Sequence, residues 1–281
     1  MGVRRAVEIA SREAAREATV YTMGPLIHNP SVLAALQSAG CGILDEERFP
    51  ETLEGIRLII RAHGISPALE KTLLDRGALL VDATCPRVKA NQLLAADLFA
   101  KGYRLFLAGE RQHAEIIGIQ GYAPGCMVLG NRAEAEAAAA ALAQATDCLT
   151  SKEPLKVALI GQTTISPEEF IAIGMGIRAY LPQAEIINTI CSATEDRQEA
   201  LRVLCAQVDA LLVVGGIKSA NTQRLQGIAK ALGKPVWLIE TAADIPSEIL
   251  AYPVVGLSAG ASTPDALIDE IEAALNALPP Y

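Results

Sequence analysis

The chain has 281 residues, of which 51% are hydrophobic and 20% are charged. This much apolar material excludes a disordered chain. The formal net charge of −8 argues against a nucleic acid partner, because phosphates require clustered lysine and arginine. No apolar run approaches the roughly 18 residues that a membrane-spanning helix needs, so we expect no membrane association.

Short apolar runs alternate with amphipathic stretches along the whole chain. The apolar runs predict strands at Thr19–Thr22, Arg57–Ile60, Ala78–Val81, Arg104–Leu107, Met127–Leu129, Lys156–Ile160, Glu185–Asn188, Ala210–Val214, Val236–Ile239 and Val254–Leu257. Helical spacing fills most intervals, for example at Val3–Ala18, Val88–Lys101, Ala133–Gln144, Pro167–Tyr180, Thr194–Gln207 and Asn221–Leu232. This alternation predicts an α/β fold class with right-handed βαβ units and mostly parallel sheets.

Breaks near Cys85 and Cys191 divide the chain into three segments. We expect residues 1–84, 85–190 and 191–281 to form three small α/β domains, with the C-terminal end of the third able to return to the first. Ligands of such folds bind beyond the carboxyl ends of the strands, so the polar residues at those ends are the candidates for function.

All three histidines of the chain follow a predicted strand closely. They are His28, His63 and His113. A single loop histidine is more often a solvated or capping residue, but three at the same edge of the sheets favour a shared site.

Two cysteines lie at the same edge. Cys85 precedes Pro86, which suits the first position of a helix, and Cys191 precedes a capping-box pattern at Ser192 and Glu195. A thiol at a helix N-terminus tends toward the thiolate, which binds soft metals and iron–sulfur clusters. The other four cysteines, Cys41, Cys126, Cys148 and Cys205, fit better as small buried side chains on the opposite edge or within a helix.

Hydroxyl and amide groups complete this edge in three further loops. These loops contain Gln162-Thr163-Thr164, then Ser219-Ala220-Asn221, then Ser258 to Thr263. Each loop opens a helix and therefore offers backbone N–H groups to an anion. Together they predict a phosphate pocket built from neutral donors, without a nucleotide-binding glycine fingerprint.

These residues, in this order, resemble the 4-hydroxy-3-methylbut-2-enyl diphosphate reductases over essentially the whole chain. The matching blocks are Gly2 to Ala6, Ile27 to Asn29, Ala62 to Gly64, Asp82 to Pro86, His113 to Glu115, Gln162 to Thr164, Cys191 to Ala200, Ser219 to Asn221 and Ala259 to Ser262. The resemblance implies three α/β domains in a trefoil around a central cluster cavity. It also implies a reductase that removes the allylic hydroxyl of its substrate and yields isopentenyl and dimethylallyl diphosphate.

The resemblance also implies a role for each matching residue. Cys85 and Cys191 would be ligands of a 4Fe–4S cluster, whose cysteine-free iron binds the substrate hydroxyl. Glu115 would supply a proton, with Thr163 and His113 relaying or orienting it. The diphosphate and the pocket would be lined by His28, His63, Gln162, Thr194, Ser219, Asn221 and Ser262. A ferredoxin or flavodoxin would deliver the electrons.

Two departures from the family pattern matter. The family has a third cluster cysteine in a Gly-Phe-Cys segment whose counterpart would lie before Met1, so we expect the natural protein to begin upstream of Met1. Relatives also commonly carry a second serine where this chain has Ala220, so one donor to the diphosphate is lost.

Two other functions are compatible with the same residues. One is a zinc hydrolase that uses Cys85, Cys191 and a histidine, although the short local spacings of zinc ligands are missing. The other is a homologue that binds an isoprenoid diphosphate without a cluster. Because the chain shows no signal peptide and its cysteines suit a reducing compartment, we expect a cytoplasmic protein.

Overall fold

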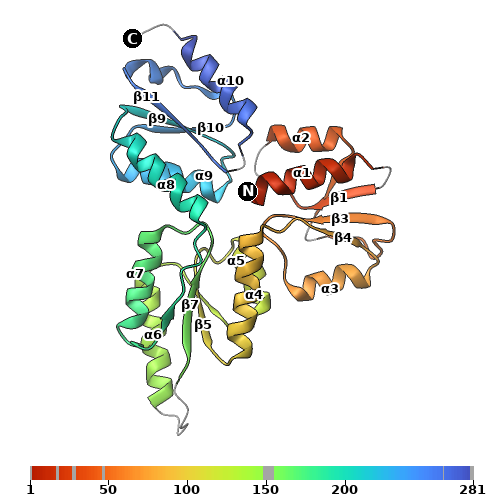
Figure 1. Cartoon of the computed structure of the whole chain (residues 1–281), viewed down its shortest axis with the longest axis vertical. Helices are drawn as coiled ribbons and strands as arrows, with labels where there is room; N and C mark the ends of the chain where they lie inside the picture. Colours follow the sequence, from red (N-terminus) through yellow and green to blue (C-terminus); the bar gives the residue numbers. More distant parts are fainter. Residues whose placement is uncertain are drawn as a thin grey trace. The chain divides into compact units, whose positions relative to one another are not determined.

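The computed structural model describes residues 2–16, 19–26, 30–45, 48–147, 155–261 and 263–278. Contacts divide the chain into two compact units, of which the first contains residues 3–49 and 192–281 and the second contains Gly2 and residues 50–191. In the described residues the strands belong to three sheets, and the strand pairs whose register is resolved are parallel. The predicted α/β class with three parallel-sheet units is confirmed (Figure 1).

The second unit contains the parallel pair β3–β4 and a four-stranded sheet with the order β6-β5-β7-β8. Its strands are β3 (Ile56–Ile60), β4 (Leu79–Asp82), β5 (Arg104–Ala108), β6 (Met127–Leu129), β7 (Val157–Gly161) and β8 (Glu185–Ile186). Its helices are α3 (Pro67–Asp75), α4 (Pro86–Ala100), α5 (Ala114–Tyr122), α6 (Arg132–Asp147) and α7 (Pro167–Arg178).

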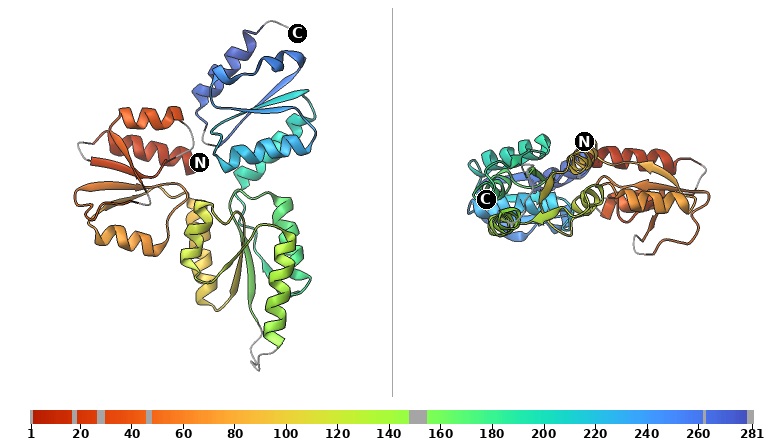
Figure 2. Two further views of the ribbon diagram at one scale, coloured as in Figure 1. Left: turned by 180° about the vertical axis from the view of Figure 1, so that it is seen from behind. Right: turned by 90° about the horizontal axis from the view of Figure 1, so that it is seen from below.

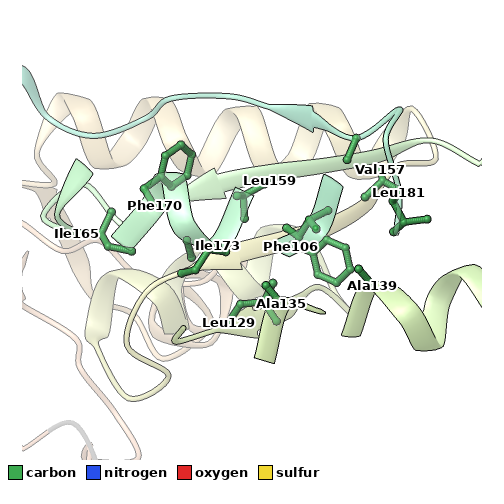
Figure 3. Close-up of a cluster of buried hydrophobic side chains, with 13 residues drawn as sticks. Phe106, Leu129, Ala135, Ala139, Val157, Leu159, Ile165, Phe170, Ile173 and Leu181 are labelled. Carbon is green, nitrogen blue, oxygen red and sulfur yellow. The ribbon is translucent and has the colours of Figure 1, made fainter. Parts of the chain in front are cut away.

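Alternate residues of β5 and β7 pack into two separate hydrophobic cores, one on each face of the sheet. Leu105 and Leu107 pack with α4 and α5 on one face of the sheet, whereas Phe106 packs with α6 and α7 on the other. Figures 1 and 2 show these two helix pairs on opposite faces, and Figure 3 shows the core beneath α6 and α7. A sheet buried on both faces explains why its strands read as continuous apolar runs.

The first unit holds the parallel pair β1–β2 and a three-stranded sheet with the order β10-β9-β11. Its strands are β1 (Thr19–Met23), β2 (Cys41–Leu44), β9 (Ala210–Val214), β10 (Val236–Ile239) and β11 (Val255–Ala259). Its helices are α1 (Gly2–Ala14), α2 (Pro30–Ser38), α8 (Ser192–Cys205), α9 (Ala220–Ala231), α10 (Asp265–Asn276) and the short 3₁₀ helices η1 (Ala242–Asp244) and η2 (Ser247–Ala251).

The central strand β9 is buried along its whole length. Leu211 and Val213 face α8 and α9, while Leu212 and Val214 face α10. At the surface of this unit, the Arg4 guanidinium pairs with the Asp265 carboxylate at 2.9 Å. None of the described helices in either unit is both long and apolar enough to span a bilayer.

The predicted strands match ten of the eleven strands in the described residues within two positions at each end. The missed strand is β2, whose Gly42 leaves room for the Tyr21 ring of β1 to lie over the backbone. The first helix ends at Ala14 and not at Ala18. The division into domains 1–84, 85–190 and 191–281 stays a prediction.

Candidate functional site

Two of the three predicted histidines meet in the second unit. His63 follows β3, and His113 follows β5 as the N-cap of α5. Their rings are edge to face, with centroids 5.2 Å apart and planes at 87°. The shared edge expected for these two residues is therefore present, while His28 lies outside the described residues.

The Glu115 carboxyl is buried in the first turn of α5, with 1% of its surface exposed. Its Oε1 accepts the Thr163 backbone N–H at 2.8 Å, and its Oε2 accepts the Thr163 hydroxyl at 2.7 Å. Burial raises the pKa of Glu115 from 4.5 to about 7, although hydrogen bonds from Thr163 and Asn91 act in the opposite direction. Such a group is half protonated near neutral pH and can give or take a proton.

His113 fixes the start of the helix that carries Glu115. Its Nδ1 accepts the Glu115 backbone N–H at 3.2 Å, as an N-cap does. Since Nδ1 accepts here, the neutral ring carries its hydrogen on Nε2. His113 thus orients Glu115 through the backbone.

Cys191 lies beside Thr163 because the chain after β8 continues alongside the end of β7. The Thr189 hydroxyl accepts the Gly161 N–H at 2.8 Å and also donates to the Gly161 carbonyl at 2.8 Å. Two residues further on, the Cys191 N–H donates to the Thr163 carbonyl at 2.9 Å. This ladder places the Cys191 backbone next to the residue that holds Glu115.

Cys85 is the N-cap of α4, and its N–H donates to the Ala62 carbonyl at 2.9 Å. Its thiol is half-buried and makes no capping hydrogen bond. Gly2 is buried against it, and a Cβ on Gly2 would overlap the Cys85 Cβ and Sγ. Since Ala62 adjoins His63, the backbone of Cys85 is tied to the loop that carries this histidine.

These contacts form a continuous series from one cysteine to the other within the second unit. Cys85 is bonded to Ala62 next to His63, whose ring meets His113. His113 caps Glu115, and Glu115 is held by Thr163, whose carbonyl binds Cys191. The structure therefore brings together four of the residues predicted from sequence, His63, His113, Glu115 and Thr163, with the backbones of the two cysteines.

Gln162 is also at this edge, and both polar atoms of its side chain are hydrogen-bonded to neighbouring residues. Its Oε1 accepts the Glu110 N–H at 3.0 Å, and its Nε2 donates to the Thr164 hydroxyl at 2.8 Å. With 1% of its surface exposed, Gln162 braces the loops after β5 and β7. A direct contact with substrate stays a prediction.

The predicted phosphate-binding residues of the first unit lie at the start of α9. Ser219 is the N-cap, with its hydroxyl accepting the Thr222 N–H at 3.4 Å. The Asn221 Nδ2 is buried without a hydrogen-bond acceptor among the described residues. Such a donor suits an anionic ligand. Thr194 lies within α8 without a described side chain, and Ser262 is outside the described residues.

The other cysteines in the described residues are Cys41, Cys126 and Cys205. Burial raises the pKa of the Cys41 and Cys205 thiols, and it raises that of Cys126 to about 11. In these three residues burial therefore disfavours the thiolate, the form that binds metals. Cys148 lies outside the described residues. Over the described part of the chain, no three His, Cys, Asp or Glu side chains are grouped to hold a metal ion.

Sequence reasoning missed Asn91 in the middle of α4. Its side chain is 4% exposed and donates from Nδ2 to the Gly161 carbonyl at 3.0 Å. The signal was available, because Val88, Ala95 and Leu98 mark a buried helix face on which an amide is out of place. A polar residue at a core position needs a partner, and that partner is often part of a site.

A family model described as LytB protein matches residues 1–276 of the chain. The chain belongs to the LytB family. This LytB chain is 45% identical over 278 residues to a 4-hydroxy-3-methylbut-2-enyl diphosphate reductase of Treponema denticola, with 96% of the chain and 93% of that protein covered. It is 38% identical over 274 residues to the protein of the same name from Aquifex aeolicus, with 96% and 90% covered.

Solved structures agree with this membership. The LytB chain is similar to the E-1-hydroxy-2-methyl-but-2-enyl-4-diphosphate reductase of Plasmodium falciparum, with a TM-score of 0.87, 28% identity, and 99% and 85% of the two chains covered. It is also similar to a structure of (E)-4-hydroxy-3-methyl-but-2-enyl diphosphate reductase, described as the terminal enzyme of the non-mevalonate pathway. That comparison gives a TM-score of 0.68, 35% identity, and 99% and 95% coverage. The family resemblance stated from the sequence motifs is confirmed.

Proposed function

We propose that this chain catalyses the reductive removal of the allylic hydroxyl of 4-hydroxy-3-methylbut-2-enyl diphosphate. Two electrons and two protons enter, the C–O bond breaks, and water leaves together with isopentenyl or dimethylallyl diphosphate. Membership of the LytB family and the names of its relatives support this activity.

The observation that carries the proposal is the buried carboxyl of Glu115, whose pKa is raised. A hydroxide is a poor leaving group, so the reaction needs an acid that is protonated near neutral pH. Glu115 has this property because burial raises its pKa to about 7. An exposed glutamate would already be ionised.

Thr163 passes this proton to the substrate hydroxyl. Its hydroxyl both donates and accepts, and it stands 2.7 Å from the Glu115 carboxyl. When Glu115 is protonated, the carboxyl can donate to Thr163 while Thr163 donates onward. His113 takes the role of orienting Glu115, because it caps the same turn of α5.

Asn221 and Ser219 bind the diphosphate group in this proposal. The free donor of Asn221 and the N-terminus of α9 both favour negative charge. His28, His63, Gln162, Thr194 and Ser262 are the other residues that we propose to bind the substrate. Neutral donors of this kind bind a diphosphate without a clustered positive charge.

Cys85 and Cys191 are proposed as ligands of a 4Fe–4S cluster. Both are half-buried free cysteines, tied by their backbones to the series of residues around Glu115. They fit two ligand positions, whereas the described residues offer no group of three metal-binding side chains. The cluster would supply the two electrons, received from a ferredoxin or flavodoxin, and a Lewis-acidic iron for the hydroxyl.

Anaerobic reconstitution with iron and sulfide tests this function. The reconstituted chain should show an iron–sulfur absorption spectrum and convert the substrate to the two products when reduced ferredoxin or dithionite is added. Glu115→Gln should lower the turnover rate by about 10²- to 10⁴-fold while leaving the spectrum intact. A chain that holds zinc and hydrolyses a substrate, or one that binds the diphosphate without any cluster, would refute the proposal.

A further inference from the structure

The turn that carries His63 lies between two helices of the second unit. The Gly64 N–H donates to the Arg61 carbonyl at 3.0 Å and closes this turn after β3. On the α5 side, Gly118 is buried, and a Cβ on it would lie 3.6 Å from the His63 carbonyl oxygen. On the α4 side, the turn meets Gln92, which is fully buried. The place of the turn therefore depends on what the two helices present to it.

The Gln92 amide contacts both the turn and α5. A Cβ on Gly64 would overlap the Gln92 Nε2, and a Cβ on Gly118 would lie 3.1 Å from the same nitrogen. This Nε2 also donates to the Ile65 carbonyl at 3.5 Å. Gly64 and Ile65 directly follow His63 in the chain. One side-chain nitrogen of α4 therefore lies against α5 and against the backbone that follows His63.

Fold stability alone does not explain an amide at this position. The Gln92 Oε1 is buried and accepts no hydrogen bond from the described residues. The bond from Nε2 is longer than the roughly 3.2 Å that most such bonds reach. At later buried positions of the same helix, Ala95 and Leu98 fill the core with apolar atoms. An apolar side chain at position 92 would avoid the cost of burying the amide, but it would lose the bond to the His63 turn.

We propose that Gln92 is a positioning residue, which holds the His63 turn between α4 and α5 and so fixes the His63 ring where it meets His113. His113 itself is placed by other contacts, because its N–H donates to the Glu110 carbonyl at 3.0 Å and its ring caps Glu115. Gln92 therefore acts on His63 and not on the proposed acid.

The consequence for catalysis rests on the proposed function, in which His63 binds the substrate. The role of Gln92 in the turn does not rest on it. Thr163 holds the Glu115 carboxyl through hydrogen bonds that do not involve Gln92. A residue that acts only on substrate binding changes KM and leaves kcat in place. Loss of the Gln92 amide should therefore raise KM about tenfold and leave kcat nearly unchanged.

The test compares Gln92→Met with Leu98→Met in the full chain. Gln92→Met removes both polar atoms at a similar side-chain length. Leu98→Met is the matched control, because Leu98 is buried on the same helix, roughly 9 Å further along it, and packs into the apolar core. The first measurement is the NMR spectrum of ¹⁵N-labelled histidine rings. The chain has three histidines, so His63→Asn and His113→Asn assign the two signals of interest.

Gln92→Met should move the ring signals of His63 and His113, because their edge-to-face contact depends on where the turn lies. Leu98→Met should leave both signals in place. If Gln92→Met does not fold, Gln92→Leu carries the test with the same expected shift, because it also removes the amide. Unchanged signals in the Gln92 variants overturn the proposal, as does an equal shift in Leu98→Met.

The ring signals need no turnover, so they separate the two proposals. An inactive reconstituted wild type whose ring signals still depend on Gln92 refutes the proposed function and supports the positioning role. An active wild type whose ring signals do not depend on Gln92 overturns that role alone. In an active enzyme, a tenfold rise in KM in Gln92→Met that is absent from Leu98→Met supports the consequence for substrate binding. An unchanged KM, or an effect confined to kcat, overturns it.

Discussion

Thr163 holds both oxygens of the Glu115 carboxyl, one through its backbone N–H at 2.8 Å and the other through its hydroxyl at 2.7 Å. The two bonds fix the plane of the carboxyl. One bond comes from the backbone of Thr163 and the other from its side chain. A side-chain substitution therefore removes the bond to Oε2 and leaves the bond to Oε1.

Thr163→Val should therefore separate positioning from proton relay. Valine has a similar shape but no hydroxyl, so the backbone bond persists while Oε2 loses its donor. We expect kcat to fall by about 10²-fold and the free energy of unfolding to fall by about 1 kcal/mol. Steady-state kinetics and urea unfolding measure the two effects.

Thr163→Ser is the matched control, because it keeps the hydroxyl. It should retain most of the activity that Thr163→Val loses. Equal activities of the two variants would show that the Thr163 hydroxyl takes no part in proton transfer.

The raised pKa of Glu115 makes the stability of the fold depend on pH. The folded-state pKa of about 7 lies above the ordinary value of 4.5, so the folded protein binds more protons between these two pH values. The contribution of Glu115 to the free energy of unfolding should therefore be largest below pH 4.5. It should decrease as the pH rises to about 7, by up to about 3 kcal/mol. Urea unfolding at a series of pH values measures this slope.

Glu115→Gln should remove the slope, since glutamine does not titrate. Glu136→Gln is the control, because Glu136 lies in an exposed ion pair with Arg132. A slope that persists in Glu115→Gln would mean that another group causes it.

Much of the fold could be predicted from the sequence because its sheets are parallel and covered by helices. Strands such as β7 and β9 are buried on both faces, so their apolar runs stand out from the helices. The strand β2 escaped because it is short and contains Gly42, whose bare backbone packs on the Tyr21 ring. The contact between Gly42 and Tyr21 joins two different strands, so it produces no periodic pattern in the sequence of either strand.

For the candidate site, the sequence predicted only which polar residues follow the ends of the strands. The position of His63 and His113 after two strands correctly indicated a shared edge. The burial of Glu115 and the hydrogen-bond partner of Asn91 could not be predicted, because they depend on how α4 packs against α5 and β7. Sequence patterns indicate candidate residues, whereas the burial of their side chains depends on tertiary packing.

Removal of single cysteines tests the assignment of cluster ligands. Cys85→Ala and Cys191→Ala should each lose most of the iron and the associated absorbance after reconstitution, because each removes a thiolate ligand. Iron content per chain and the visible spectrum measure the loss.

The chain provides two matched controls for this experiment. Cys126→Ala and Cys205→Ala remove thiols whose pKa is raised by burial. Both variants should bind iron as the wild type does. Iron binding that survives in Cys85→Ala or Cys191→Ala, or that is lost in Cys126→Ala, would contradict the ligand assignment.

Gly64 tests whether the His63 loop must keep its present shape. Its φ of +69° is in the left-handed region, and a Cβ there would overlap the Gln92 amide and come within 3.0 Å of the Thr84 methyl. Gly102 has a similar φ of +80°, but a Cβ there would meet nothing within 4 Å. Both alanine substitutions carry the backbone cost of about 1 kcal/mol.

Only Gly64→Ala should also displace Gln92, which is fully buried. We expect it to lower the free energy of unfolding by about 1–3 kcal/mol more than Gly102→Ala does. Since His63 is the preceding residue and its ring contacts His113, Gly64→Ala should also reduce activity, whereas Gly102→Ala should leave it unchanged. Urea unfolding and steady-state kinetics on the same preparations check both effects. Equal stabilities of the two variants would show that the Gln92 side chain can move away without cost. The packing of Gly64 against Gln92 would then not hold the loop in place.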